Sequence, residues 1–201
     1  MKDFFELNFR PAHAGDAEHL AKLIDIAGEG IPTWLWAKSL ERGQSPLEVG
    51  VNRALRRTGG FSHRNATLAQ SYSEIAGMVL SYPIDKLPKE NPDDLPLPIA
   101  PFLELEKSAV GTWYINALAV FPAFQGIGIG NSLMEEAENS ARQHGYDRVS
   151  IQVYEQNIGA VRLYERLGYS VTERAPVRHH PCQPYYTGDV LLLEKVLSST
   201  V

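Results

Sequence analysis

Residues 122–134 read Pro-Ala-Phe-Gln-Gly-Ile-Gly-Ile-Gly-Asn-Ser-Leu-Met, with glycine at 126, 128 and 130. The glycines stand between a predicted strand at 113–121 and a predicted helix at 130–144. Alternating glycines let the backbone turn sharply and point successive N–H groups toward an anion. The N-terminus of the following helix adds unsatisfied donors and positive partial charge. The stretch therefore predicts a site for a phosphate or pyrophosphate.

Three other interpretations of these glycines compete: a P-loop, a dinucleotide fingerprint and a simple turn. A P-loop needs Gly-Lys-Ser/Thr, but Gly130 is followed by Asn131 and Ser132. A dinucleotide fingerprint needs G-x-G-x-x-G, and counting from Gly126 the sixth position is Asn131. The spacing excludes both. A glycine-rich turn that only reverses the chain stays open on the glycines alone.

Regular elements extend on both sides of the loop. On the C-terminal side we expect strands at 149–154, 169–174 and 189–196, and a helix at 158–167 that ends at Gly168. On the N-terminal side we expect strands at 7–10, 66–70 and 74–82, a helix after Asp16, and a helix at about 46–57 that Ser45 and Glu48 cap. This order predicts an α+β fold, with a mixed sheet flanked by helices.

Residues 83–111 differ from their surroundings. Six prolines fall between Pro83 and Pro101, among acidic and basic residues and without a sustained period. We expect a long loop here, and long loops inside compact domains are usually lids or linkers. A lid within a single domain that spans residues 1–201 is the favoured interpretation, and a domain boundary is the alternative.

The composition narrows the function classes. The chain has 201 residues and a net charge of −5, which disfavours a nucleic-acid binder. Cys182 is the single cysteine, so an intramolecular disulfide is impossible. No run approaches the roughly 18 apolar residues of a membrane span, and the first six residues lack the apolar core of a signal peptide. We expect a cytoplasmic protein with no membrane partner.

Two motifs together resemble a known family. Residues 125–130 match the Q/R-x-x-G-x-G/A loop of the GNAT superfamily of N-acetyltransferases, and residues 157–169 are similar to its N-x-x-A-x-x-L-Y-x-x-x-G-F/Y helix. Either motif is moderately specific, whereas the ordered pair is strong. The resemblance implies a central, mostly antiparallel sheet of about six to seven strands, splayed between two parallel strands.

The resemblance also implies acetyl-CoA as co-substrate and an amine as acceptor. The strand residues Leu118, Ala119 and Val120 would bind the pantetheine arm, and Asn157 would face its amide or the reacting region. The pyrophosphate would lie on a set of loop residues: Gln125, Gly126, Ile127, Gly128, Ile129, Gly130 and Asn131. Tyr164 matches the tyrosine that protonates the departing thiolate in many relatives, and a packed core tyrosine is the alternative.

The resemblance does not identify the general base that would take the proton of the amine. Several relatives place a glutamate where this chain has Asn116, and an amide cannot accept the amine's proton. Other candidates are Glu104, Glu106, Glu155, His179 and His180, and for each of them a solvated surface residue is the favoured alternative. A water chain, or an amine that arrives deprotonated, would also suffice.

The acceptor side is less defined. Trp34 and Trp36 lie between the first two predicted helices and could form one wall of an acceptor site, or belong to the core. Tyr185 and Tyr186 could line the same region. The run His179-His180-Pro181-Cys182 lacks a further metal ligand, so we expect no metal.

We therefore expect an acetyl-CoA-dependent N-acetyltransferase that acts on a small molecule or a peptide. The alternative is a CoA-binding sensor or structural module without turnover, and Asn116 is its best support. The sequence identifies neither the amine nor whether two copies form a homodimer.

Overall fold

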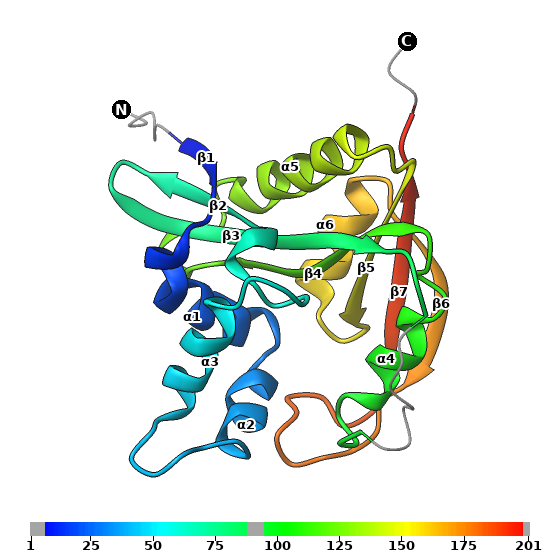
Figure 1. Ribbon diagram of the computed structural model, residues 1–201. Coiled ribbons are helices and arrows are strands. Elements are labelled where there is room, and N and C mark those ends of the chain that lie inside the picture. Colours follow the sequence, from blue (N-terminus) through cyan, green and yellow to red (C-terminus); the bar gives the residue numbers. More distant parts are fainter. Residues whose placement is uncertain (1–6, 88–94, 199–201) are drawn as a thin grey trace. The chain divides into compact units, whose positions relative to one another are not determined.

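The computed structural model describes residues 7–87 and 95–198. Seven strands in this part form one sheet, in the order β1-β2-β3-β4-β5-β7-β6 (Figure 1). The strands are β1 (Leu7–Pro11), β2 (Ala66–Ser71), β3 (Glu74–Ile84), β4 (Thr112–Val120), β5 (Arg148–Tyr154), β6 (Ser170–Pro176) and β7 (Asp189–Val196). The expected mixed α+β sheet is confirmed.

The sheet is mostly antiparallel. Strand β2 pairs antiparallel with β1 and β3, and β7 pairs antiparallel with β5 and β6. Strands β4 and β5 are parallel, with Trp113–Ile115 opposite Val149–Ile151. This pairing involves the first half of each strand, although β4 continues to Val120 and β5 to Tyr154. One parallel pair in a mostly antiparallel sheet agrees with the expected fold class.

The helices are α1 (Ala17–Ala27), α2 (Ile31–Ala37), α3 (Pro46–Ala54), α4 (Ala100–Glu106), α5 (Ile129–Gln143) and α6 (Ile158–Arg166). The chain packs as two compact units. The first comprises residues 7–81 and 117–137, and the second comprises residues 82–87, 95–116 and 138–198.

In the first unit, α1, α2 and α3 lie side by side (Figure 1). Gly50 makes this packing possible, because a Cβ there would lie 2.6 Å from the ring of Trp36.

Ser45 caps α3 as expected: its hydroxyl accepts from the Glu48 N–H, and the Glu48 carboxylate accepts from the Ser45 N–H at 2.6 Å. Asp16 stands at the N-cap of α1 but makes no capping bond there. Its carboxylate instead binds the Arg10 guanidinium and the His13 N–H.

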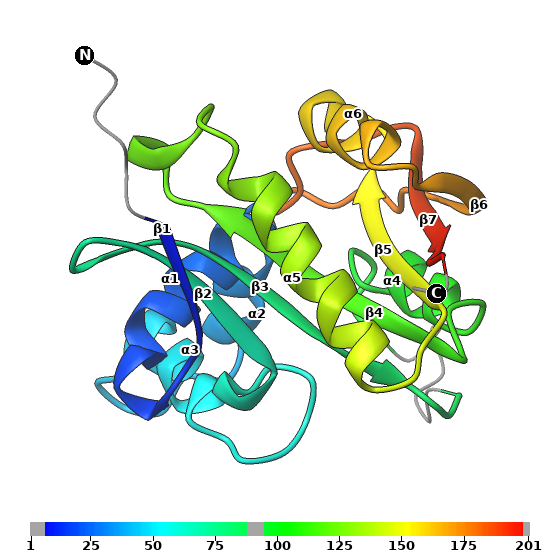
Figure 2. The ribbon, with the colours of Figure 1, turned by 90° about the horizontal axis from the view of Figure 1, so that it is seen from above.

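In the second unit, β7 lies between β5 and β6 (Figure 2). Its core includes the aliphatic residues Ile115, Val149, Ile151 and Leu191–Leu193, together with buried aromatic side chains such as Tyr114 and Tyr154. A charged group is also buried here. Glu138 of α5 is 5% exposed and accepts two hydrogen bonds from the Lys195 ammonium, at 2.7 and 2.8 Å, and one from the Tyr169 hydroxyl at 3.2 Å.

The structure corrects two expectations. The segment 83–111 is not loop throughout: β3 extends to Ile84, and α4 occupies Ala100–Glu106. Pro101 stands in the first turn of α4, where proline costs no hydrogen bond, and both Leu103 and Leu105 are buried. Residues 88–94 of the expected loop lie outside the described residues. The second correction is α2, which contains the two tryptophans expected between helices and has Pro32 in its first turn.

Candidate functional site

The glycine loop belongs to the first unit. A 3-10 turn, Pro122–Phe124, follows β4, and α5 begins at Ile129. Between them Gly126 and Gly128 adopt left-handed backbone conformations, with φ of +80° and +95°. Residues with a Cβ are strained in this region, so glycine is the residue that the loop requires. Left-handed glycines that lead into a helix N-terminus turn backbone N–H groups to one side, as in an anion nest.

The loop also has room for a ligand. A Cβ built on Gly126 or on Gly128 meets no atom within 4 Å, and both residues are exposed. Ile129 is buried and anchors the start of α5, whereas Ile127 is 53% exposed. The Gln125 amide donates to the carbonyl of Val120 at 3.0 Å and so ties the loop to the end of β4.

The strand residues expected to bind the pantetheine arm lie directly before this loop. Ala119 is buried, while Leu118 and Val120 are half-buried. Gly77 belongs to the same arrangement, although it lies outside both sequence motifs. A Cβ on Gly77 would lie 2.7 Å from the Ala119 carbonyl oxygen, so glycine there allows close approach to the backbone of β4. The isolated glycine inside a predicted strand was the available signal.

The helix motif lies in the second unit. Tyr164 is on α6 and is 5% exposed, and its ring centroid lies 6.3 Å from that of Tyr169. Asn157 stands at the N-cap of α6, where its side-chain oxygen accepts from the Ala160 N–H at 3.2 Å. The asparagine of the motif therefore has a structural role of its own, because it helps to set the start of the helix that bears Tyr164.

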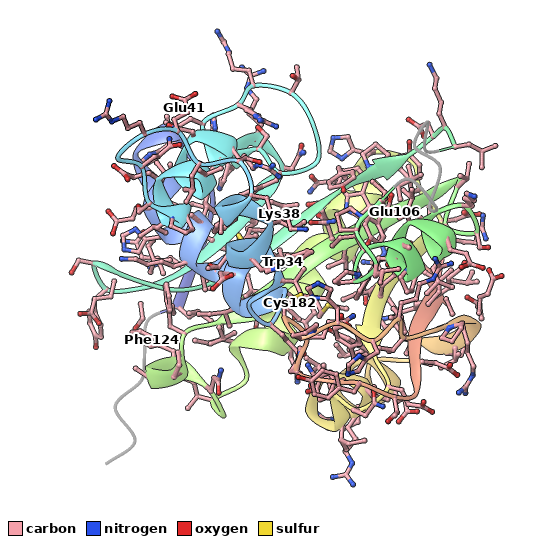
Figure 3. All side chains as sticks on the ribbon, turned by 90° about the horizontal axis from the view of Figure 1, so that it is seen from below. Trp34, Lys38, Glu41, Glu106, Phe124 and Cys182 are labelled. Atoms are coloured by element: carbon pink, nitrogen blue, oxygen red, sulfur yellow. The ribbon has the colours of Figure 1, made fainter. Side chains whose placement is uncertain are left out.

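Asn116 of β4 lies near a tyrosine pair in the second unit. The rings of Tyr82 and Tyr114 meet edge to face at 5.9 Å, and Asn116 is hydrogen-bonded to Tyr114. Burial raises the pKa of both phenols, and the negative charge of Glu106 raises both pKa values further. Glu106 is half-buried at the end of α4 (Figure 3), and its charge acts on the tyrosine to which Asn116 is hydrogen-bonded.

The other candidate bases are less suited to that role. Glu104 is exposed. Glu155 binds the Arg174 guanidinium at 3.3 Å and the Asp189 N–H at 3.2 Å. His179 packs on the ring of Tyr186 at 4.5 Å, and His180 Nδ1 lies 3.0 Å from the sulfur of Cys182. In the described part of the chain no three potential metal ligands come together.

The two tryptophans of α2 have different surroundings. Trp36 is 2% exposed and stacks on Phe61, so it is a core residue of the first unit. Trp34 is half-buried, and the Lys38 ammonium lies 3.7 Å from its ring centroid (Figure 3). The sequence could not separate the two, because both stand in one short apolar segment.

Comparison with known proteins agrees with these features. Residues 28–169 match the model of the Acetyltransferase (GNAT) family, and the chain belongs to this family. The uncharacterized N-acetyltransferase YdgE of Bacillus subtilis (strain 168) is 30% identical over 59 residues, which are 29% of this chain and 38% of that protein. The chain thus matches well under two thirds of that curated relative.

Solved structures share the fold. An N-acetyltransferase from Staphylococcus aureus Mu50 superposes with a TM-score of 0.68 at 19% identity, over 94% of this chain and all of that one. YncA of Salmonella typhimurium, solved with its cofactor acetyl-CoA, superposes with a TM-score of 0.60 at 17% identity, over 98% of this chain and 96% of that one. Within residues 7–87 and 95–198, none of the helices combines the length and hydrophobicity of a membrane span.

Proposed function

We propose that this protein transfers the acetyl group of acetyl-CoA to the nitrogen of an amine. The observation that carries the proposal is the loop from Gln125 to Gly130, whose two left-handed glycines stand open directly before a 15-residue helix. The match to the acetyltransferase family covers this loop and the α6 motif together. The absence of a carboxylate at position 116 does not argue against the binding of acetyl-CoA. It argues only against removal of the amine's proton by a side chain at that position.

The residues present fit a pyrophosphate ester. The N–H groups around Gly126, Gly128 and Asn131 would hold the phosphates, because an exposed nest without side chains lets backbone approach an anion closely. The backbone of Leu118–Val120 would bind the pantetheine arm. When bound, acetyl-CoA supplies an acetyl thioester, whose C–S bond breaks as the C–N bond to the amine forms.

Tyr164 is proposed to donate its phenolic proton to the sulfur that leaves. A phenol keeps its proton near neutral pH and can be a donor in a dry site. Burial of Tyr164 supports this role, because water is then kept from competing with the sulfur for the hydroxyl group. The amine's own proton would pass to water or to a carboxylate such as Glu106, since Asn116 accepts none.

The proposal is tested by thiol release from acetyl-CoA across a panel of amines. The wild type is expected to release CoA with at least one amine, and Tyr164→Phe is expected to lower kcat about a hundredfold with little change in the KM for acetyl-CoA. Tyr169→Phe is the matched control, because it removes a buried phenol 6.3 Å away whose hydroxyl binds Glu138. That variant should lose stability and keep its kcat.

A second candidate is a CoA-binding module without turnover, which Asn116 in place of an acid favours. Binding of acetyl-CoA without thiol release on any amine would support it. An equal loss of kcat in both tyrosine variants would remove the assigned role of Tyr164.

A further inference from the structure

The end of α3 and the segment that follows it have a positive charge that no acidic residue balances. Residues 49–73 contain no aspartate or glutamate, although the net charge of the chain is −5. We call the four arginines of this stretch the arginine patch: Arg53, Arg56, Arg57 and Arg64. Among residues 7–87 and 95–198 no carboxylate forms an ion pair with any of them. Arginines elsewhere do have such partners, as Arg148 has in Glu194 at 3.1 Å.

Hydrogen bonds bring the two ends of the arginine patch together. The hydroxyl of Ser62, which is 1% exposed, donates to the carbonyl of Arg56 at 2.5 Å and accepts from the N–H of Arg64 at 3.3 Å. A second link joins His63 Nδ1 to the carbonyl oxygen of Ala54 at 2.9 Å. Because these bonds use the main chain of the two arginines, their guanidinium groups stay available for a ligand.

The arginines act on one another electrostatically. Burial lowers the pKa of the Arg53 guanidinium, and the positive charge of Arg56 lowers that pKa further. Arg56, Arg57 and Arg64 are exposed. Like charges that are held together repel one another and destabilise the folded chain, so the patch gains from an anion that comes from outside.

The arginine patch is separate from the glycine loop, and both belong to the first unit. The patch adjoins the first residue of β2, Ala66, whereas Ser71 at the other end of β2 leads into the β2–β3 hairpin. The chain that enters the glycine loop lies at the hairpin end, where the Phe121 N–H donates to the Ala76 carbonyl at 2.8 Å. The six residues of β2 span about 17 Å, which exceeds the screening length of roughly 8–10 Å in physiological salt. An anion on the glycine loop therefore does not neutralise the patch.

The composition of the patch favours one kind of anionic partner. Residues 49–73 contain arginine but no lysine, and a guanidinium binds a carboxylate through two parallel hydrogen bonds. Leu55 is 42% exposed among the arginines and offers an apolar contact. Single-stranded nucleic acids bind through exposed aromatic rings, whereas Phe61 of this segment stacks on the buried Trp36. These features suit a peptide with several carboxylates and an apolar side chain.

We propose that the arginine patch is a docking surface for an acidic, carboxylate-rich segment of a partner protein. The guanidinium groups pair with the carboxylates, and Leu55 contacts an apolar side chain of the segment. The inference goes beyond acetyl transfer, because docking requires neither acetyl-CoA nor the residues of the glycine loop.

The first test is a binding series with the full chain, measured by fluorescence anisotropy. The probes are a labelled peptide of six glutamates around one leucine, the same peptide with glutamines in place of the glutamates, and a labelled RNA decamer. We expect the acidic peptide to bind at least about tenfold more tightly than the glutamine peptide, and its affinity to fall as salt is added. Equal affinity for the two peptides would overturn the inference. Tighter binding of the RNA than of the acidic peptide would overturn it as well.

The second test reverses charges of the patch. The double variant Arg56→Glu, Arg64→Glu keeps the main-chain bonds to Ser62 and should raise the Kd for the acidic peptide at least about tenfold. The matched control is Lys86→Glu with Lys107→Glu, which changes the net charge equally at two exposed sites of the second unit. It should bind nearly as the wild type does, and equal weakening in both double variants would contradict the proposal.

A single variant covers the case in which the double variant does not fold. The side chain of Arg57 is exposed, so Arg57→Glu should fold and bind the acidic peptide several-fold more weakly. Unchanged affinity of the folded Arg57→Glu variant would then reject the docking surface.

Acetyl-CoA separates this surface from the proposed cofactor site. The affinity for the acidic peptide should be the same with and without saturating acetyl-CoA, and Gly128→Ala should bind the peptide as the wild type does. Displacement of the peptide by acetyl-CoA would assign the arginines to the cofactor site and overturn the inference. Failure of the proposed function has a different signature, since acetyl-CoA would then not bind while the peptide still does.

Discussion

The side-chain oxygen of Asn157 accepts a hydrogen bond from the N–H of Ala160, and this bond caps the helix that bears Tyr164. The same asparagine was expected to face the cofactor. The two roles are separable, since serine also caps helices but has a shorter side chain.

We expect Asn157→Ala to lower the free energy of unfolding by about 1 kcal/mol, and Asn157→Ser to lower it much less. Chemical denaturation of both variants measures this difference. If Asn157 also binds the cofactor, the serine variant will keep its stability and bind acetyl-CoA more weakly. Equal stability of the alanine variant and the wild type would contradict the capping role.

The glycine loop has a matched control elsewhere in the chain. Gly128 and Gly145 both have positive φ, and in both cases an added Cβ meets nothing within 4 Å. Alanine at either position should therefore cost about 1–2 kcal/mol of stability through backbone strain alone. Gly128→Ala should in addition raise the Kd for acetyl-CoA at least about tenfold, because the methyl group stands where the phosphate would approach. Gly145→Ala should not change it, and titration calorimetry on both variants compares them.

The buried carboxylate of Glu138 predicts a large effect from the loss of its cation. Its side chain is 7% exposed and that of Lys195 is 24% exposed. Lys195→Met leaves the carboxylate buried without its ammonium partner. The free energy of unfolding should therefore fall by about 3 kcal/mol. Lys22→Met breaks an exposed ion pair with Glu18 and should have a much smaller effect. Similar urea midpoints for the two variants would show that the Glu138 pair contributes no more than a surface pair.

Asp16 predicts a pH dependence of stability. The Arg10 guanidinium, at 2.8 Å from both carboxylate oxygens, holds the pKa of Asp16 below its usual value. A lowered pKa in the folded state stabilises the protein above the unfolded pKa of about 3.9, and this contribution is lost as the pH falls through the folded pKa. Asp16→Asn should thus be less stable than the wild type by about 1–3 kcal/mol near neutral pH. The difference should shrink below about pH 4, as denaturation curves at several pH values would show.

Local patterns explain which parts of the fold could be predicted. The strand, glycine loop and helix from Thr112 to Gln143 follow from contiguous residues, and so does the Ser45 capping box. The short helices α2 and α4 span seven residues each, too few for an apolar period to stand out among the prolines.

Some features of the candidate site also follow from local sequence, whereas others depend on tertiary packing. The left-handed glycines at 126 and 128 were predictable, because the loop's chemistry demands them. The surroundings of Asn116 were not, since the charge of Glu106 acts on the neighbouring Tyr114 only in the folded chain. Which of Trp34 and Trp36 is buried was likewise decided by packing on Gly50 and Phe61.

The proposed function depends first on the binding of acetyl-CoA by the loop that precedes α5. Its most direct test is isothermal titration of the wild type and of Gly128→Ala with acetyl-CoA, with Gly145→Ala as the control. We expect saturable binding to the wild type and to Gly145→Ala, and weakened binding to Gly128→Ala. No binding of acetyl-CoA to the folded wild type, or equal affinity in all three proteins, would contradict it.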